Sequence, residues 1–140
     1  MLKEKINYKA LKNTKQQEIY NFQKASAIFA DYGYTTIKLS DDWMGADFIA
    51  ISFDGTEYLK VQLKGRLTFA KKYQGKNKNI HICFRDDKSG IWYLYNHDEL
   101  LKKFTQQIEN SDSWVSKGEY HFPLLNKEKQ ALLAPFAIGK

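Results

Sequence analysis

The chain has 140 residues, of which 43% are hydrophobic and 15% are aromatic. This length and composition suit a single domain with one core and exclude an intrinsically disordered chain. No apolar run approaches the roughly 20 residues of a membrane-spanning helix, and the first residues lack a signal-peptide pattern. We therefore expect a cytoplasmic protein without a membrane partner. A single cysteine, Cys83, excludes an internal disulfide framework.

The net charge of +6 is concentrated in one segment of the chain. From Tyr58 to Arg85 there are eight basic residues and no Asp or Glu, so the remainder of the chain carries −2 (6 minus 8). A local positive patch of this kind attracts polyanions, nucleic acid first among them. A solvated lysine surface without a partner is the alternative.

The first third of the chain predicts an arm, a helix and a strand. Residues 1–13 are rich in lysine and show little periodicity, so we expect a loosely held N-terminal arm. A helix is predicted to begin around Thr14, because apolar residues recur at helical spacing, and to stop near Gly33. Residues 34–39 have strong strand propensity. Residues 40–45 then predict a loop, with Trp43 as its apolar anchor.

A hairpin follows this loop. Residues 48–53 are apolar almost throughout, as in a strand covered on both faces. Asp54-Gly55 is a strong hairpin-turn dipeptide. In the next strand the residues alternate, which places Gln62 and Lys64 together on one face. Asp47 enters the first strand, so the polar groups of all three residues are expected to converge at one end of the hairpin.

The remaining elements complete a mixed α and β pattern. We expect them in this order: residues 67–73 as helical turns or a strand, a loop at 74–79, strands at 80–84 and 91–95, a helix capped by Asn96 and containing Leu100, Leu101, Phe104 and Ile108, a strand at 120–122 and a short helix from Asn126 through Leu133. We interpret residues 14–140 as one α+β domain. The aromatic-rich residues 114–136 fit either a partner surface or the core.

Several common chemistries lack their motifs. The chain contains no phosphate-binding glycine loop and no Gly-x-Ser-x-Gly element. His81, His97, His121 and Cys83 lack recognisable zinc-ligand spacing. The polar groups left to carry chemistry are those of Asp47, Gln62 and Lys64, with Glu18 from the first predicted helix.

These residues carry a resemblance to a known family. Gly45-Ala46-Asp47, followed by Val61-Gln62-Leu63-Lys64-Gly65-Arg66, resembles the PD-(D/E)xK nuclease superfamily. The Gln-x-Lys wording is most similar to some restriction and intron-associated homing endonucleases. Ala46 stands where the motif name has Pro, and Gln62 stands where an acid is usual. The resemblance extends from Thr14 to Arg66, and it implies a restriction-endonuclease-like fold: a mixed β-sheet core with flanking helices.

The resemblance also implies a site and a cofactor. Glu18, Asp47, Gln62 and Lys64 are the expected catalytic residues, and Mg²⁺ or Mn²⁺ is the expected cofactor. Its expected ligands are Glu18, Asp47, Gln62 and the main-chain carbonyl near Leu63, since such cations prefer oxygen. Lys64 is expected to orient or deprotonate the attacking water. Glu18 also fits a plain surface glutamate in the first turn of the helix. The residues expected to hold nucleic acid are Lys60, Arg66, Lys71, Lys72, Lys76 and Lys78.

The leading functional hypothesis is a metal-dependent endonuclease that hydrolyses the phosphodiester bonds of double-stranded DNA. The alternative is a catalytically inactive nucleic-acid-binding or assembly domain on the same fold, since the neutral Gln62 removes one negative charge from the metal site. A third reading is an α+β interaction domain whose lysines are only solvated. A monomer and a homodimer both remain open.

Overall fold

The computed structural model describes residues 1–140, apart from the side chain of Trp43. Its strands are β1 (Tyr34–Trp43), β2 (Ala46–Ser52), β3 (Tyr58–Lys64), β4 (Leu67–Ala70), β5 (Ile80–Arg85), β6 (Trp92–Asn96), β7 (Glu119–Phe122) and β8 (Ala137–Gly139). Its α-helices are α1 (Thr14–Asp31), α2 (His97–Ile108) and α3 (Lys127–Leu133). The short helical turns are η1 (Tyr8–Ala10), η2 (Lys71–Tyr73), the π-helical η3 (Ser113–Lys117) and η4 (Ala134–Phe136).

The strands form one mixed sheet and one small antiparallel sheet. The larger sheet has six strands in the order β1-β2-β3-β5-β6-β8. β3 and β5 run parallel, and the other neighbouring pairs are antiparallel. β4 pairs with β7 in the second sheet. The predicted α+β class, with a mixed sheet and flanking helices, is confirmed.

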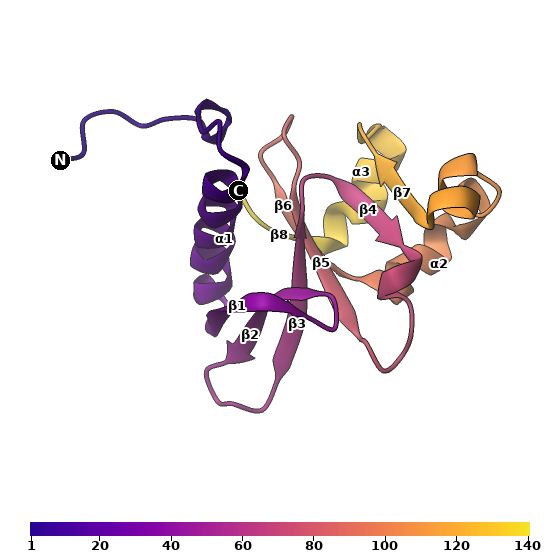
Figure 1. Ribbon diagram of the computed structural model, residues 1–140, viewed down its shortest axis with the longest axis horizontal. Helices are drawn as coiled ribbons and strands as arrows, with labels where there is room; N and C mark the ends of the chain where they lie inside the picture. Colours follow the sequence, from indigo (N-terminus) through magenta and orange to yellow (C-terminus); the bar gives the residue numbers. More distant parts are fainter.

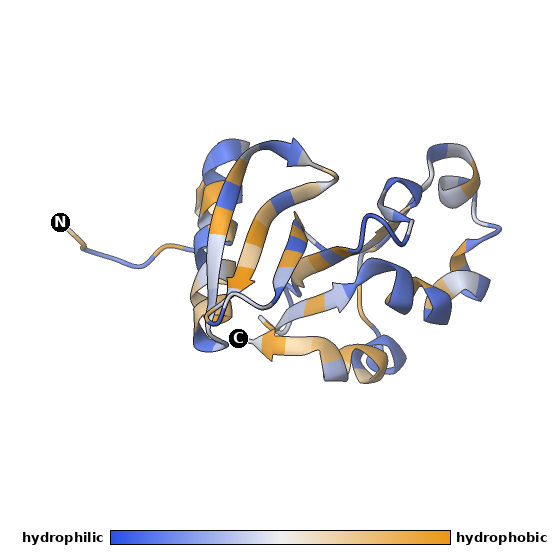
Figure 2. Ribbon diagram, turned by 90° about the horizontal axis from the view of Figure 1, so that it is seen from below, coloured by the Kyte–Doolittle hydropathy of each residue, from blue (hydrophilic) through white to orange (hydrophobic). Residues whose placement is uncertain are grey.

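The large sheet separates two apolar layers. α1 covers one side, whereas α2, α3 and the β4–β7 pair lie on the other (Figure 1). On the α1 side, Phe29 packs edge-on against Phe48 of β2, with ring centroids 5.5 Å apart. On the opposite side, the ring centroids of Phe69 in β4 and Phe104 in α2 lie 5.2 Å apart. Hydrophobic and hydrophilic residues alternate along the strands in Figure 2, because successive side chains point to opposite faces.

Helix boundaries follow the capping residues in the sequence. The Asn13 side chain accepts hydrogen bonds from Lys15 N and Gln16 N where α1 begins, and Gly33 at φ +80° follows its end. The Asn96 side chain accepts a bond from Glu99 N, and Asn126 caps α3 in the same way. The predicted starts of these helices are therefore confirmed. Within the described part of the chain, no helix is both long enough and apolar enough to cross a bilayer.

The predicted loop at residues 40–45 is wrong. β1 continues to Trp43, and only Met44 and Gly45 form the turn into β2. Both turn residues have positive φ, +53° and +88°, as a two-residue turn between twisted antiparallel strands requires. The polar residues before the turn favour a loop by local propensity, but in the structure they extend the strand. The predicted anchoring by Trp43 falls on a side chain outside the described residues.

The connection from β3 to β5 contains no α-helix among its described residues. It holds β4 and η2 instead, which resolves the open choice at residues 67–73 as a strand followed by a 3-10 turn. β4 is fully buried, and Leu67 and Phe69 join the core beneath α2. The C-terminal part also belongs to this core, because Trp114, Phe122 and Leu133 are buried there.

Candidate functional site

The site begins where β2 and β3 stop pairing. The last pair of their ladder is Phe48 with Val61, although both strands continue beyond it. There the Leu63 N–H donates a hydrogen bond of 2.8 Å to Asp47 Oδ2. A side-chain carboxylate thus takes the place of a main-chain acceptor. This bond fixes the Asp47 carboxylate at the opening between the two strands.

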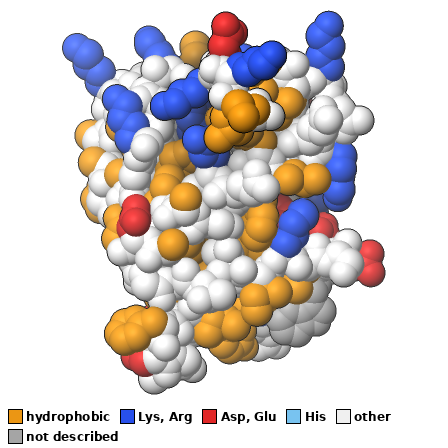
Figure 3. Space-filling view, turned by 90° about the vertical axis from the view of Figure 1, so that its left-hand side faces the viewer, with side chains coloured by type: hydrophobic (Ala, Val, Ile, Leu, Met, Phe, Trp, Pro, Cys, Tyr) orange, Lys and Arg blue, Asp and Glu red, His pale blue; other side chains and the backbone are white. Residues whose placement is uncertain are grey.

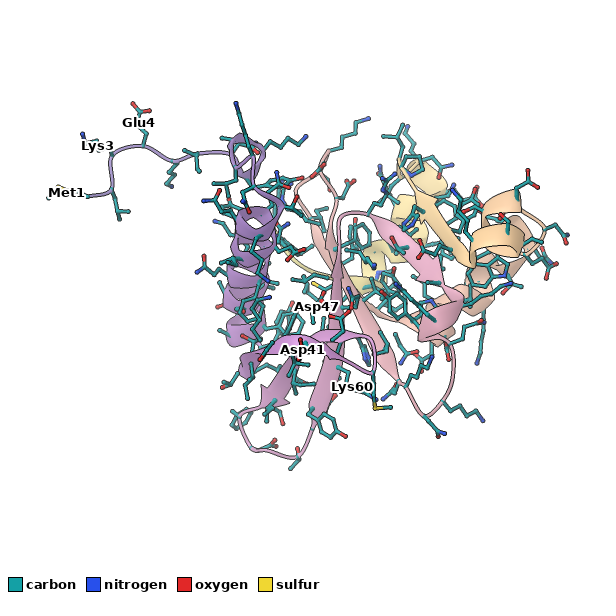
Figure 4. All side chains as sticks on the ribbon, in the orientation of Figure 1. Met1, Lys3, Glu4, Asp41, Asp47 and Lys60 are labelled. Carbon is teal, nitrogen blue, oxygen red and sulfur yellow. The ribbon has the colours of Figure 1, made fainter. Side chains whose placement is uncertain are left out.

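A cavity of about 450 Å³ opens at this point, between α1 and the ends of the strands. Every residue that the sequence predicted as a catalytic group or metal ligand lines it: Glu18, Asp47, Gln62, Leu63 and Lys64. Asp47 lies near the middle of the molecule in Figure 4, whereas Lys60 lies nearer the β2–β3 loop. The fold therefore collects, in one cavity, residues far apart in the sequence.

Gln62 lines this cavity and has a buried polar atom without a partner in the described part of the chain. The residue is only 8% exposed, and its Oε1 has no hydrogen-bond partner among the described residues. Its amide Nε2 lies 3.5 Å from the Leu63 carbonyl oxygen, at the outer limit of a hydrogen bond. A buried acceptor without a partner is destabilising, and in native proteins it marks the place of a water, an ion or a functional group.

The Asp47 carboxyl has an altered acidity. Burial raises its pKa above the ordinary value, and the neighbouring Asp42 carboxyl raises it further. The Leu63 N–H and the Lys64 ammonium act in the opposite direction. Burial dominates because it disfavours the charged form. A cation next to this carboxylate would offset that cost.

Lys64 is displaced toward its neutral form. Burial lowers the pKa of its ammonium, and the positive charge of Lys72 lowers it further, while Glu119 and Asp47 oppose the shift. The Lys64 Nζ lies 5.4 Å from the centre of the Tyr73 ring. A lysine with a depressed pKa can accept a proton more readily at neutral pH. Lys64 is therefore a better proton acceptor than an ordinary exposed lysine.

Glu18 lies at the rim of the cavity. It projects from α1 and lines the cavity, but its side chain is 57% exposed. Its Oε2 lies 3.8 Å from Lys15 Nζ, one turn earlier on the helix. The geometry combines both sequence interpretations: the glutamate is a surface residue, and it also faces the predicted site.

Sequence reasoning missed several groups that line the same cavity. Asp42 comes from the end of β1, lines the cavity with Asp47, and raises the pKa of the Asp47 carboxyl. The cavity's further cations are Lys15, Lys38 and Arg85. The view of the α1 side in Figure 3 shows Lys and Arg side chains gathered at its upper end. The sequence signal for Asp42 lies in Met44-Gly45. If these two residues are taken as the whole turn, Asp42 falls in the strand that precedes it.

The predicted nucleic-acid-binding residues lie elsewhere. None of the six, namely Lys60, Arg66, Lys71, Lys72, Lys76 and Lys78, is among the described residues that line the cavity. Lys60 is 8% exposed, and its Nζ donates to the Asn77 carbonyl at 3.4 Å. Lys72 lies 3.9 Å from the Glu119 carboxylate. Their role toward nucleic acid stays a prediction.

The residues present fit a hard divalent cation only through mixed oxygen ligands. Among the described residues, no group of three or more His, Cys, Asp and Glu side chains is placed to hold a metal ion. The available oxygens are the Asp47 carboxylate, the partnerless Gln62 Oε1 and the Leu63 carbonyl. Carboxylate, amide and main-chain oxygens, with several waters, are the ligands that Mg²⁺ accepts.

Comparison with known proteins shows a likeness to a solved structure. No protein-family model matches the chain, and no curated protein matches it. The solved structure of a bacterial homing endonuclease, I-Ssp6803I, superposes with a TM-score of 0.47 at 17% sequence identity. The superposition covers 82% of this chain and 78% of that one. The likeness concerns the course of the backbone, so chemistry must be argued from the cavity itself.

Proposed function

We propose that the protein is a divalent-cation-dependent nuclease that hydrolyses DNA phosphodiester bonds in the cavity between α1 and the ends of β2 and β3. One observation carries this proposal. Asp47, Lys64 and Gln62, whose buried Oε1 has no partner among the described residues, line one cavity at the ends of β2 and β3. An acid, a neutral oxygen ligand and a lysine of lowered pKa together suit phosphodiester hydrolysis.

The cation would be held by Asp47, Gln62 and the Leu63 carbonyl, with Glu18 reached at the rim. The chemistry that a bound Mg²⁺ or Mn²⁺ supplies is polarisation of the phosphate and acidification of a bound water. The Leu63 N–H keeps the Asp47 carboxylate oriented through its 2.8 Å hydrogen bond. Burial of Gln62 restricts its amide to few rotamers, so its oxygen is positioned in advance.

Lys64 carries the proton transfer in this proposal. Water attacks phosphorus, a new P–O bond forms, and the P–O bond to the leaving sugar oxygen breaks. The proton of the attacking water passes to the neutral Lys64 amine, and solvent protonates the leaving oxygen. The resulting ammonium then faces the negative phosphate product, where its charge is stabilising. The lowered pKa of Lys64 keeps a larger neutral fraction available than an ordinary lysine has.

Double-stranded DNA is the proposed partner. Lys15, Lys38 and Arg85 line the cavity around the acids, and in this proposal they hold the phosphates that flank the cleaved one. The net charge of +6 adds a long-range attraction that salt screens. The lysines of the β4–β5 connection extend this positive charge beyond the cavity.

The test is cleavage of duplex DNA by purified protein with Mg²⁺, with Mn²⁺ and with EDTA. We expect cleavage with either cation and none with EDTA. Asp47→Asn should reduce the rate by about 10²–10⁴-fold, because it removes the charged ligand while keeping an acceptor for the Leu63 N–H. Asp41→Asn is the matched control: it makes the same charge change on β1 at an exposed residue that is not among those lining the cavity.

The neutral Gln62 gives the binding-only alternative a specific observation in its favour. If the wild-type protein binds DNA in a salt-sensitive manner but cleaves it with neither cation, the nuclease proposal is overturned. Cleavage that survives undiminished in Asp47→Asn would instead remove the proposed site.

A further inference from the structure

β1 contains a bulge directly beside the candidate site. Lys38 pairs with Phe48, and the next pair along the strands joins Trp43 to Ala46. Residues 39–42 of β1 therefore stand opposite the single residue Asp47 of β2. Bulges bend a strand and change the direction of its side chains, and they are frequent beside active sites.

The bulge gives the site a second acid. Asp42 lines the cavity together with Asp47, and its carboxyl is near enough to raise the pKa of Asp47. In a regular two-stranded ladder without extra residues, Asp42 would not stand against Asp47. Two carboxylates this close repel each other when both are ionised, and a divalent cation bound to both removes the repulsion.

Gln62 shows what this second acid replaces. Its buried Oε1 has no partner among the described residues. An amide oxygen can bind a cation, but it brings no charge. Asp47 and Gln62 alone would give a cation a single negative charge. Asp42, Asp47 and Gln62 together offer two carboxylates, whose charges neutralise a divalent ion, and one neutral amide oxygen.

We propose that Asp42 is a direct ligand of the divalent cation and supplies the negative charge that Gln62 lacks. This inference rests on the proposed function, because it concerns the cation of the same site. It assigns the ligand role to a residue outside the resemblance motif. Asp42 and Glu18 are both exposed, but they differ in their partners: the Glu18 carboxylate lies 3.8 Å from Lys15 Nζ, whereas Asp42 acts on Asp47.

The experiment measures Mn²⁺ binding directly, by the loss of the free-ion EPR signal on titration with protein in the absence of DNA. Asp42→Asn should weaken Mn²⁺ binding by about 10- to 100-fold or more, the loss typical of a residue that holds or directly supports a metal. Asp41→Asn, with the same charge change one residue earlier, should bind nearly as the wild type does. Glu18→Gln should show a smaller loss than Asp42→Asn.

A charge-relocation variant makes the test more specific. The double variant Asp42→Asn with Gln62→Glu should recover most of the lost Mn²⁺ affinity, because the second charge returns at the neighbouring position. Thermal unfolding of the metal-free proteins serves as the folding check. Asp42→Asn should unfold at the same or a higher temperature than the wild type, since it removes a like-charge contact.

The outcomes separate this inference from the proposed function. If Asp42→Asn and Asp41→Asn bind Mn²⁺ with equal affinity, the inference is overturned. The proposed nuclease function still stands in that case, provided that the wild type cleaves DNA. A wild type that binds no Mn²⁺ would overturn both. A wild type that binds Mn²⁺ through Asp42 but does not cleave DNA would support the inference and overturn the nuclease activity.

Discussion

The basic residues of this protein fall into two groups with different origins. One group lines the cavity and comes from four separate elements: Lys15, Lys38, Lys64 and Arg85. The members of the other group lie close together in the chain, on η2 and the loop after it: Lys71, Lys72, Lys76 and Lys78. Basic residues that lie close together in the sequence therefore predict a charged surface, whereas the basic residues of the cavity are brought together by the fold. The parallel pairing of β3 with β5 brings the end carrying Arg85 alongside Lys64.

The two groups also differ in their surroundings. Lys64 is partly buried near Asp47, and burial lowers its pKa. Lys71, Lys72 and Lys76 are exposed, so their charges are screened by salt. We expect the cations of the cavity to change the rate of the reaction and the lysines of η2 and its following loop to change the affinity for DNA. Variants of the two groups can break this comparison or sharpen it.

The largest effect is expected from Lys64→Met. Methionine keeps an apolar stem of similar length but cannot carry a proton, so cleavage at saturating DNA should fall by about 10²–10⁴-fold. DNA affinity, measured by fluorescence anisotropy without divalent cation, should change much less. The matched control is Lys102→Met, at an exposed lysine of α2 that is not among the cavity-lining residues. A Lys64→Met protein with wild-type cleavage would remove the distinction between the groups.

A smaller effect is expected from Lys76→Ala, in the second group. Loss of one phosphate contact should reduce the slope of log affinity against log salt by about 1 and weaken binding equally for unrelated DNA sequences. The cleavage rate at saturating DNA should stay unchanged. An unchanged salt slope would mean that Lys76 is only a solvated charge, as one interpretation of the sequence allowed.

Part of the site was predictable because it follows from the two-residue alternation of side chains along a strand. Alternation along β3 places Gln62 and Lys64 on one face, and the acid at Asp47 opens the neighbouring strand. Such a pattern needs no knowledge of distant contacts. The mixed α+β class was predictable for the same reason, since apolar periods and the caps at Asn13 and Asn96 are local signals.

The rest of the site depends on pairings that no local pattern encodes. Arg85 reaches the cavity only because β5 lies parallel to β3, and the connection between them has no helix that would announce a crossover among its described residues. Asp42 reaches it through an irregular register against β2. The β4–β7 pair joins segments about 50 residues apart, and such long-range pairing is fixed by burial of the whole core.

The smallest predicted effect concerns the turn Met44-Gly45, which follows the irregular stretch of β1. Met44 adopts φ +53° and is 45% exposed, so it bears the cost of a left-handed conformation with little packing in return. Met44→Asn should raise the free energy of unfolding by up to about 1 kcal/mol, since Asn tolerates this conformation and favours such turns. Urea unfolding measures the gain, and Met44→Ala, which keeps a Cβ without the tolerance of Asn, should show none. Equal stability of the two variants would contradict the assigned turn, and with it the register that places Asp42 among the cavity's charges.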